Sequence, residues 1–520
     1  MILRRKIMSI DKEMLRATAK SIVTIPQHYQ LEMEASVPEG NEQERCFIWE
    51  DPENQDNTIE IVLDLVTGQL KRLAIDREEV GATKEEAKQI CLDGAARAVT
   101  DQFVAKYAPD SAEYTSVVID KRGDRIEFAF RQEVGGLPLP NTGCNLTLDS
   151  GLNIVRYHLK GRMDRKAFKP VWPASIVDAD TVMQQILSDL RMVPTIVSLY
   201  PSMYDMKGTE PEYRLVYEPI PGRRSIDAVT GRDMFGPEHY VMPPSHPMLQ
   251  TDTDTAPKPA TDETVSWEQR LGINLEDYVL EKSTDDGERI KSLYQIRAQE
   301  EEKPEPDSLS VDAYMERKWG DNLRNFRESS IMLQLEKSTG RLVGFHWMDR
   351  WKEGVPTLNR EQCWQKADQF LRNVFPDYVH YLQLENDHEE SEEEPCDRQF
   401  FYLPVYIDGI LVNHERVTIC VSTSTGEVCT YMGVSYEMIQ ELTGRSFRPI
   451  LAAEAAFEYY VEQMKLRLKW YLDRDQEATM FRLLYEPTAT FCDEQGKQRT
   501  LRYIDAVSGE LIWENTRIGL

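Results

Sequence analysis

The sequence predicts an α+β protein made of repeated units, each with one helix packed on an antiparallel sheet. Three observations indicate this: a short turn pattern that recurs six times, alternating apolar residues beside it, and amphipathic helical stretches ahead of the strand pairs. A helix followed by antiparallel strands and a hairpin is typical of α+β folds, in which the helix covers one sheet face. The 520 residues are 41% hydrophobic and 29% charged, which is a globular composition.

The recurring turn places a polar residue, two further residues, Ser or Thr, and then Gly between two apolar strands. Its six glycines are Gly68, Gly151, Gly231, Gly340, Gly426 and Gly509. Glycine allows a positive φ in a hairpin turn without strain, and the polar residue can accept a hydrogen bond from a turn N–H. Metal binding is disfavoured, because each turn offers one carboxylate where Ca²⁺ takes about six to eight oxygens.

The spacing of these glycines divides the six units into two trios. The intervals are 83, 80, 109, 86 and 83 residues, and the longest spans a segment rich in Pro, Thr and Asp. The third units match best: LVYEP and SIDAVTG (215–231) correspond to LLYEP and YIDAVSG (483–509). We therefore predict a first three-unit module at 1–243, a mobile linker at 244–266 and a second module at 267–520.

Four amphipathic helices are predicted ahead of the strands. In the second unit the apolar stripe runs from Ala87 to Phe103 after a capping-box signature at Thr83 and Glu86, and in the fifth unit it runs over 363–375. A third helix is expected over 182–193, and a long fourth helix over 452–472.

The units resemble the repeated domain named for the bacterial YcdB and YcdC proteins, which is itself similar to PepSY-type modules. The resemblance rests on the helix AKQICLDGAARA (87–98), the segments GGLPLPN (135–141) and GILVN (409–413), and the D-x-x-[ST]-G turns. It covers about 22–243 and 267–516 and implies tandem PepSY-like units in a bacterial protein without an established enzymatic role. PepSY-like modules are regarded as inhibitory or peptide-interacting parts attached to peptidases. We recognise neither a signal peptide nor an attached peptidase domain here.

Charge and cysteine usage predict a cytoplasmic protein that binds no nucleic acid. Lys and Arg number 61 against 89 Asp and Glu, and the net charge of −28 repels phosphate backbones. No apolar run reaches the roughly 18 residues of a membrane span. The eight cysteines form no C-x-x-C pair, which favours buried, reduced thiols, and a Cys420–Cys429 bridge across a hairpin is the alternative.

The sequence contains no recognisable catalytic motif, so we predict no catalytic residue, cofactor or metal site. Phosphate-binding loops, H-E-x-x-H and G-x-S-x-G are absent. His239 and His246 lie close together among prolines, but zinc needs three or four converging ligands. The Tyr-Glu-Pro segments that contain Glu218 and Glu486 are the best candidates for an acid pair, and their equivalent places in both trios favour a structural role.

Two groups of residues are candidates for partner binding. One is the acidic segment 385–397, with Glu389, Glu390, Glu392, Glu393 and Glu394, and the other is the aromatic pair Trp347 and Trp351. A solvated loop and core packing are the respective alternatives.

We expect a non-enzymatic binding or regulatory protein that recognises a protein or an extended peptide, because open antiparallel sheets can accept an added strand at their edges. A carboxylate-dependent hydrolase with a site in the cleft between the two modules is the main alternative. A scaffold whose acidic loops dock a basic partner is a third hypothesis.

Overall fold

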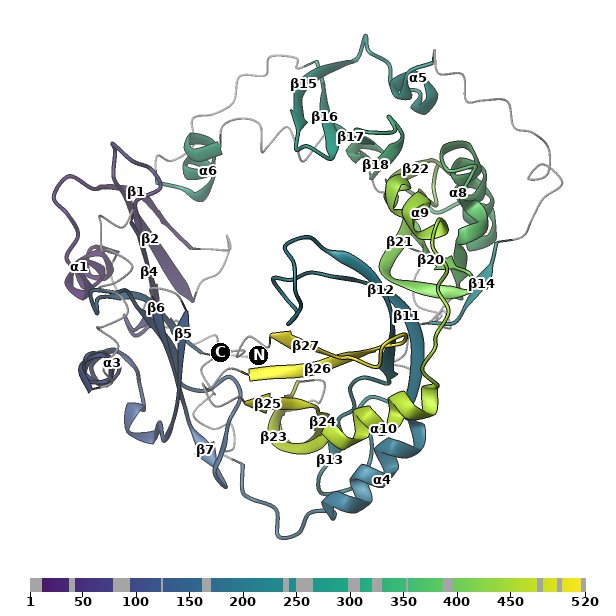
Figure 1. Cartoon of the computed structure of the whole chain (residues 1–520). Helices are drawn as coiled ribbons and strands as arrows, with labels where there is room; N and C mark the ends of the chain where they lie inside the picture. Colours follow the sequence, from purple (N-terminus) through teal and green to yellow (C-terminus); the bar gives the residue numbers. More distant parts are fainter. Residues whose placement is uncertain are drawn as a thin grey trace, which may run out of the picture.

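Antiparallel sheets dominate the structure, and a few helices cover them, as the sequence predicts (Figure 1). The structure is a computed structural model that describes residues 12–36, 43–77, 94–122, 125–160, 170–236, 243–248, 265–297, 309–319, 330–351, 354–386, 396–474, 480–492 and 498–515. In this part of the chain, no helix is long and apolar enough to cross a membrane.

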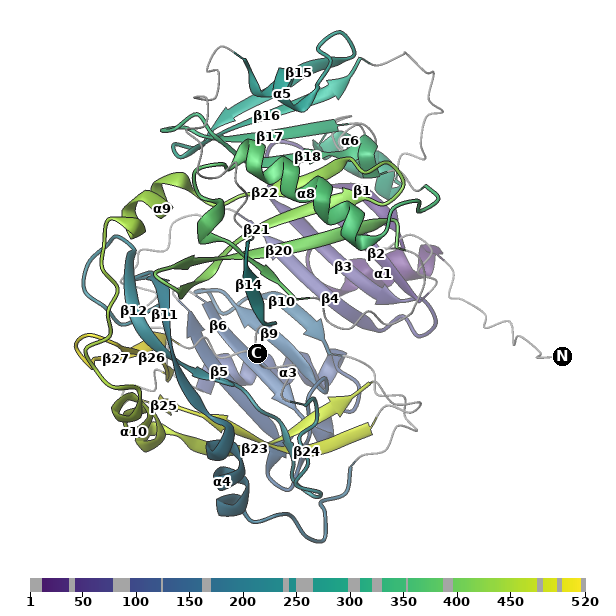
Figure 2. The same ribbon diagram turned by 90° about the vertical axis from the view of Figure 1, so that its right-hand side faces the viewer.

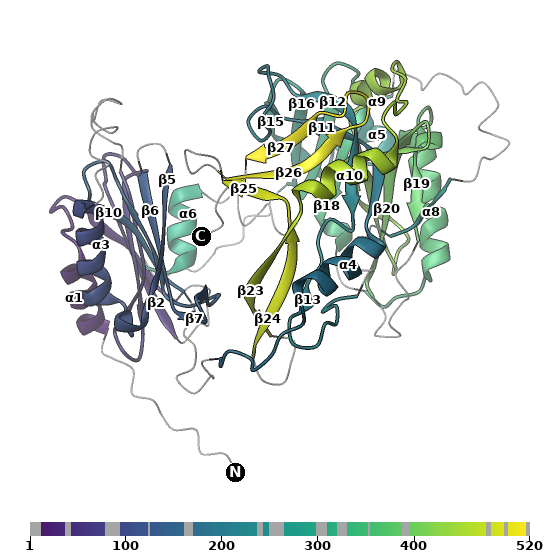
Figure 3. The same cartoon turned by 60° about the horizontal axis from the view of Figure 1, so that its bottom comes forward.

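The first two predicted units form one eight-stranded antiparallel sheet. Its strand order is β1-β2-β3-β4-β10-β9-β6-β5. The elements are α1 (Lys12–Ile22), β1 (Gln30–Ala35), β2 (Glu44–Glu50), β3 (Thr58–Asp64), β4 (Leu70–Asp76), α3 (Gly94–Tyr107), β5 (Ser116–Arg122), β6 (Arg125–Arg131), β9 (Cys144–Leu148) and β10 (Ile154–Leu159). Alternation along β3 sends Ile59, Ile61 and Leu63 to one face, where they pack with Leu15 and Ala19 of α1. Helices α1 and α3 therefore lie on the same side of this sheet (Figure 3).

The fourth and fifth predicted units repeat this topology in a second sheet. The order β15-β16-β17-β18-β22-β21, with β20 beside β21, matches β1-β2-β3-β4-β10-β9 and β6. The elements are α5 (Trp267–Leu271), β15 (Tyr278–Asp285), β16 (Arg289–Ile296), β17 (Ser330–Glu336), β18 (Leu342–Trp347), α8 (Arg360–Val374), β20 (Arg398–Ile407), β21 (Ile410–Ser422) and β22 (Val428–Met432). Helix α8 crosses this sheet as α3 crosses the first (Figure 2). The shared pairing order supports the internal repeat.

The third and sixth predicted units contribute shorter sets of strands. They comprise α4 (Ala179–Asp189), β11 (Arg191–Leu199), β12 (Glu212–Ile220) and β13 (Ile226–Asp227), and α10 (Ala453–Gln463), β23 (Lys465–Asp473), β24 (Met480–Thr488), β25 (Thr490–Cys492), β26 (Gln498–Asp505) and β27 (Leu511–Asn515). Two helix predictions extend too far. The helix expected over 452–472 ends at Gln463, and Val193 lies in β11 rather than in α4. Both segments instead form strands because each pairs along its length with a neighbouring strand.

These two units exchange hairpins. The β11–β12 hairpin of the third unit pairs with β26 of the sixth unit, and the β23–β24 hairpin of the sixth unit pairs with β13 of the third unit. Helix α10 packs on β11, β12 and β26, whereas α4 packs on β24, and the two helices lie side by side (Figure 1). Helix α10 thus covers the hairpin of the third unit together with β26 of its own unit, and α4 packs on a strand of the sixth unit, so these two helices do not cover the strands of their own unit alone.

The predicted boundary after residue 243 does not coincide with a division between sheets. Strand β11 pairs in parallel with β21, so a single 12-stranded sheet contains strands from before and after the linker. Part of the linker is itself a strand: β14 (Ser245–Pro247) pairs with β19 (Gln383–Glu385). The linker residues 249–264 lie outside the described part of the chain.

Two large apolar clusters form the core. One fills the space between the first sheet and its helices. The other extends through the second sheet and both exchanged hairpins, and it includes Leu139 from the first module. Leu139 follows the small hairpin of β7 (Glu133–Val134) and β8 (Leu137–Pro138), whose Val134 carbonyl accepts a 3.0 Å hydrogen bond from Trp470 Nε1 of β23. This hairpin joins the first sheet to the sixth unit.

Five of the six predicted turn glycines adopt the left-handed conformation. The φ angles of Gly68, Gly231, Gly340, Gly426 and Gly509 lie between 65° and 77°. Gly151 does not, and the positive φ of 61° falls on Leu152. The turn there is built differently, because Leu152 N donates to the carbonyl of Asp149, two residues before the glycine.

We predict that Gly340→Ala lowers the free energy of unfolding by about 1 kcal/mol, because an L-residue is strained at a positive φ. A Cβ at Gly340 would meet no atom within 4 Å, so steric overlap contributes nothing. Gly94→Ala is the matched control, since its Cβ is equally unhindered and its φ is not left-handed. Urea unfolding of both variants is the measurement, and equal destabilisation by the two changes would contradict the turn argument.

Candidate functional site

The acidic residues that begin the turns have a structural role. Oδ1 of Asp64 accepts hydrogen bonds from Val66 N (3.1 Å) and Thr67 N (2.8 Å). Burial alone would raise the pKa of Asp64, but hydrogen bonds from Thr67 and Val66 hold this pKa below its usual value. Asp227 and Asp505 accept the same pair of turn N–H groups. Nowhere in the described ranges do three or more His, Cys, Asp or Glu side chains gather as metal ligands could.

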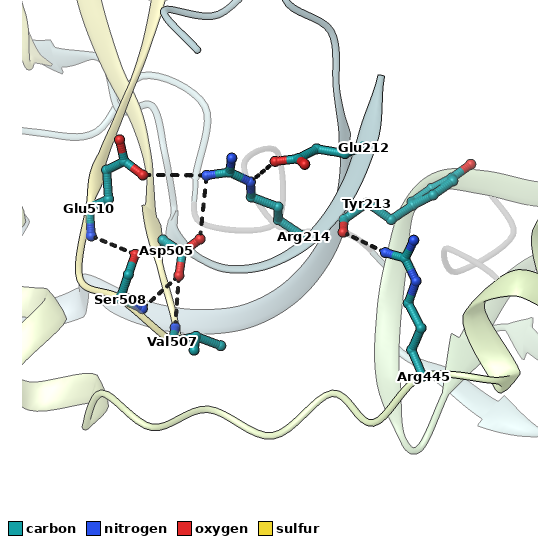
Figure 4. Close-up of polar contacts among 8 residues, drawn as sticks. All are labelled: Glu212, Tyr213, Arg214, Arg445, Asp505, Val507, Ser508 and Glu510. Atoms are coloured by element: carbon teal, nitrogen blue, oxygen red, sulfur yellow. Dashed lines mark hydrogen bonds and ion pairs between the residues drawn. The ribbon is translucent and has the colours of Figure 1, made fainter. Parts of the chain in front are cut away.

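Two of these turn aspartates also join the exchanged hairpins. Nη1 of Arg214 on β12 lies 3.7 Å from Oδ2 of Asp505, and Arg214 also contacts Glu212 and Glu510 (Figure 4). The counterpart is Arg482 on β24, whose Nη1 lies 3.6 Å from Oδ2 of Asp227. Each arginine therefore reaches the turn of the other unit.

The Tyr-Glu-Pro tyrosines make the same kind of crossing contact. The Tyr217 hydroxyl donates to the carbonyl of Leu451 at 2.8 Å, and the Tyr485 hydroxyl donates to the carbonyl of Val177 at 3.0 Å. Each acceptor lies two residues before the helix of the other unit. These contacts support the structural interpretation of both segments.

The two glutamates of these segments have different surroundings. Burial raises the pKa of Glu218, and the charge of Arg502 opposes this shift. Glu486 forms ion pairs with Arg467 and Lys469. Glu218 lies in the 12-stranded sheet and Glu486 in a separate three-stranded sheet, and no hydrogen bond or ion pair joins them in the described part of the chain.

Trp347 lies in the core, with a side chain that is 9% exposed. Its Nε1 donates to the Tyr278 hydroxyl at 3.1 Å, and the guanidinium of Arg350 stacks on its ring. This favours core packing over partner contact. Trp351 ends the short helix η4 (Met348–Trp351), and its side chain lies outside the described atoms. The five glutamates between 389 and 394 fall in 387–395, which also lies outside the described residues, so their role stays a prediction.

The cysteines and histidines in the described part of the chain include buried thiols and an imidazole that is hydrogen-bonded to an asparagine. Cys363 is buried on α8 and Cys420 in β21, as predicted, and Cys420 and Cys429 are free thiols. Nδ1 of His246 lies 2.8 Å from Oδ1 of Asn386, while His239 falls outside the described residues.

The strongest candidate for a binding site is the outer edge of the second sheet. Strand β15 ends the 12-stranded sheet on one side. All its side chains after Tyr278 are exposed, including Val279 (42%) and Leu280 (50%). Exposed apolar residues on an edge strand favour pairing with another chain.

A hollow of about 340 Å³ lies between α5 and α8 on the helical side of this sheet. Trp267, Leu271, Phe370 and Val374 supply apolar walls, and Arg270 and Asn373 supply polar groups. Helix α5 has 5 residues, whereas α1, in the same place before the first sheet, has 11. Ser266 caps the start of α5, and Gly272 ends it with a φ of 73°.

The equivalent edge of the first sheet is already occupied by the chain itself. Glu34 N of β1 donates to the carbonyl of Leu309 at 3.0 Å. From there α6 (Val311–Trp319) lies on the sheet face opposite α1 and α3 (Figure 3). Glu50 fixes it by accepting hydrogen bonds from the Tyr314 hydroxyl (2.6 Å) and Lys318 Nζ (2.7 Å).

Side-chain polarity explains why α6 docks on the first sheet. Tyr314 packs against Met33, Cys46 and Val62. From the strand registers, the positions in the second sheet that correspond to these three residues hold Lys282, Lys291 and Gln334. The three positions that receive α6 on the first sheet are therefore polar on the second, and within the described ranges no strand pairs with the outer edge of β15.

The model of the YcdB, YcdC repeated domain family matches residues 12–161 and 299–435. This chain belongs to that family. The first match covers the first sheet with its two helices, and the second covers most of the second sheet, as the resemblance in the sequence predicts. The exchanged hairpins and their helices fall outside both matched ranges.

Two relatives cover nearly the whole chain. The "Uncharacterized protein YcdB" of Bacillus subtilis (strain 168) is 25% identical over 514 residues, 97% of this chain and 98% of the relative. "Uncharacterized protein YcdC" of the same organism is 25% identical over 484 residues, 91% of this chain and 95% of the relative. Among solved structures, the Bacillus megaterium YpeB C-terminal domain is 11% identical and covers 43% of this chain and 96% of its own, with a TM-score of 0.27.

Sequence reasoning missed the open edge of β15 and the hollow beside α5. One signal was available, because Ser266 and Gly272 bracket a helix that is too short to cover a sheet face. The docking of α6 carried no such signal, since it depends on a contact between residues 264 positions apart.

We predict that Glu218→Gln stabilises the protein near neutral pH. The pKa of Glu218 is higher in the folded state, so the folded state loses stability as pH rises from the ordinary value of 4.5 through the folded value. Glutamine removes this loss, so the variant should be more stable than the unaltered protein near neutral pH and equally stable below pH 4.5. Thermal melting over a pH series is the measurement, with exposed Glu462→Gln of α10 as the control. An advantage that grows on acidification would contradict the assignment.

Proposed function

We propose that this protein is a non-enzymatic binding or regulatory protein that takes an extended peptide segment of a partner as an added strand on β15. The main support is the comparison of two equivalent edges: β1 already holds a segment of the chain through the Leu309 carbonyl, whereas β15 has exposed apolar side chains and no such segment among the described residues. Strand addition uses backbone hydrogen bonds for affinity and alternating side chains for specificity.

The two edge strands have the same local geometry. Each contains a register shift at the same place, between Leu31 and Met33 in β1 and between Leu280 and Lys282 in β15. Counting from these shifts, Ser283 corresponds to Glu34, whose N–H points away from the sheet and donates to Leu309. We expect the Ser283 N–H to donate to a carbonyl of the bound peptide in the same way.

The hollow beside α5 supports the same proposal. Helix α5 is joined to the sheet by a hydrogen bond from the Tyr294 hydroxyl of β16 to Glu268. The hollow thus lies on a face next to the open edge and offers apolar contact to a side chain of the peptide. Because the net charge is −28, the partner should be neutral or basic.

Other parts of the proposal follow from the sequence. We propose that the chain consists of six PepSY-like units in two trios. We also propose that it acts in the cytoplasm, needs no cofactor and binds no nucleic acid. The acidic segment 385–397 would raise the association rate of a basic partner.

The test uses three labelled ten-residue peptides that alternate valine with threonine, lysine or glutamate. We expect the threonine and lysine peptides to bind. Ser283→Pro should weaken their binding about fivefold, because it removes one edge N–H donor worth about 1 kcal/mol. Ser283→Ala keeps the N–H and should bind as the unaltered protein does. Fluorescence anisotropy gives the affinities.

Two results would count against this proposal. One is the absence of binding by all three peptides, and the other is equal binding by Ser283→Pro and Ser283→Ala. Equal melting temperatures of the two variants would show that the proline has not disturbed the sheet.

A further inference from the structure

Cys420 and Cys429 form a pair of buried thiols on neighbouring strands. The register of β21 and β22 pairs Cys420 with Thr430 and Val421 with Val428, so a bulge takes Cys429 out of the one-to-one ladder. At such a bulge two residues of one strand, here Cys429 and Thr430, lie opposite one residue of the other, here Cys420, and both cysteines are 0% exposed. Strands in a sheet lie about 4.7–4.9 Å apart, within the roughly 4.4–6.8 Å that a disulfide spans between Cα atoms.

The surroundings make the two thiols unequal. The hydrogen bond from Cys420 lowers the pKa of Cys429, burial opposes this, and the nearby charge of Arg350 lowers it further. The hydrogen bond to Cys429 and burial raise the pKa of Cys420. The Cys429 thiol also donates to the Arg350 carbonyl at 3.1 Å. The Arg350 guanidinium also donates to the carbonyl of the neighbouring Val428 at 3.0 Å, which places its positive charge beside Cys429, so we take Cys429 as the attacking thiol.

We propose that Cys420 and Cys429 are a redox-modification site that hydrogen peroxide converts into an intramolecular disulfide. The Cys429 sulfur attacks one peroxide oxygen, the O–O bond breaks, and the other oxygen leaves as water. The sulfenic acid formed on Cys429 is then attacked by the Cys420 sulfur, the S–O bond breaks, and a second water leaves. The two thiols lose two electrons and two protons in total, and the peroxide is reduced to water.

Burial determines which oxidants fit. Glutathione disulfide is too large to contact two sulfurs that have no exposed surface, so the proposal requires a small oxidant such as hydrogen peroxide. The other buried cysteines serve as references, because burial raises the pKa of Cys46, Cys144 and Cys363 and none of them is hydrogen-bonded to a second thiol in the described part of the chain. Cys396 is the exposed reference.

The test treats the reduced full-length protein with hydrogen peroxide or, separately, with glutathione disulfide. Remaining thiols are then blocked with N-ethylmaleimide, and the digested protein is analysed by mass spectrometry. We expect peroxide to yield a peptide in which Cys420 is linked to Cys429, with the mass of two hydrogens lost, before Cys144 or Cys363 is oxidised. Cys420→Ser should leave Cys429 as a sulfenic acid that dimedone traps when it is added together with urea to unfold the protein, whereas Cys363→Ser should not change the linkage.

The linkage in the unaltered protein decides the question even if a variant folds poorly. Oxidation of Cys144 or Cys363 before the pair would overturn the proposal, and so would a disulfide from either thiol to Cys396. Equal yields of the linked peptide from glutathione disulfide and peroxide would contradict the role of burial.

Discussion

The structure depends on a reciprocal exchange of backbone hydrogen bonds between two nearly identical hairpins. Ala228 N donates to the carbonyl of Leu483 at 2.8 Å, and its counterpart Ala506 N donates to the carbonyl of Leu215 at 3.0 Å. Buried backbone groups must be paired, and an unpaired one costs about 1–3 kcal/mol. Each half of the chain therefore contributes strands that complete a sheet of the other half.

The two large sheets show how a duplicated fold can acquire separate roles. Both have the same strand order, but an insertion between β16 and β17 carries α6 onto the first sheet. The apolar residues that receive α6 are replaced by lysines and a glutamine in the second sheet. One edge is thus contacted by the chain itself, and the other, beside a shortened helix, has no such segment among the described residues.

Local signals in the sequence were enough to predict the fold class and most turns. The α+β class, the family and five left-handed glycines follow from patterns within a few residues. The exchange could not be predicted in this way. Because LVYEP of β12 and LLYEP of β24 are so similar, the sequence does not indicate whether each strand pairs within its own unit or with the other unit. The alternating apolar residues Leu466, Leu468 and Trp470 are typical of a strand. Because β23 begins only two residues after α10 ends, the helical spacing of apolar residues continues into it, and the predicted helix was therefore too long. Whether the edge of β15 is exposed depends on how distant parts of the chain pack around it, and local sequence patterns carry no information about that packing.

The exchange is tested most directly by cutting the chain between its halves. A protease site placed within 249–264, outside the described residues, allows the purified protein to be cleaved there and analysed by size-exclusion chromatography without denaturant. The exchange predicts that both fragments elute together as a one-to-one complex and separate only when urea unfolds them. Two folded fragments that elute separately would contradict it, because neither could then hold a strand of the other.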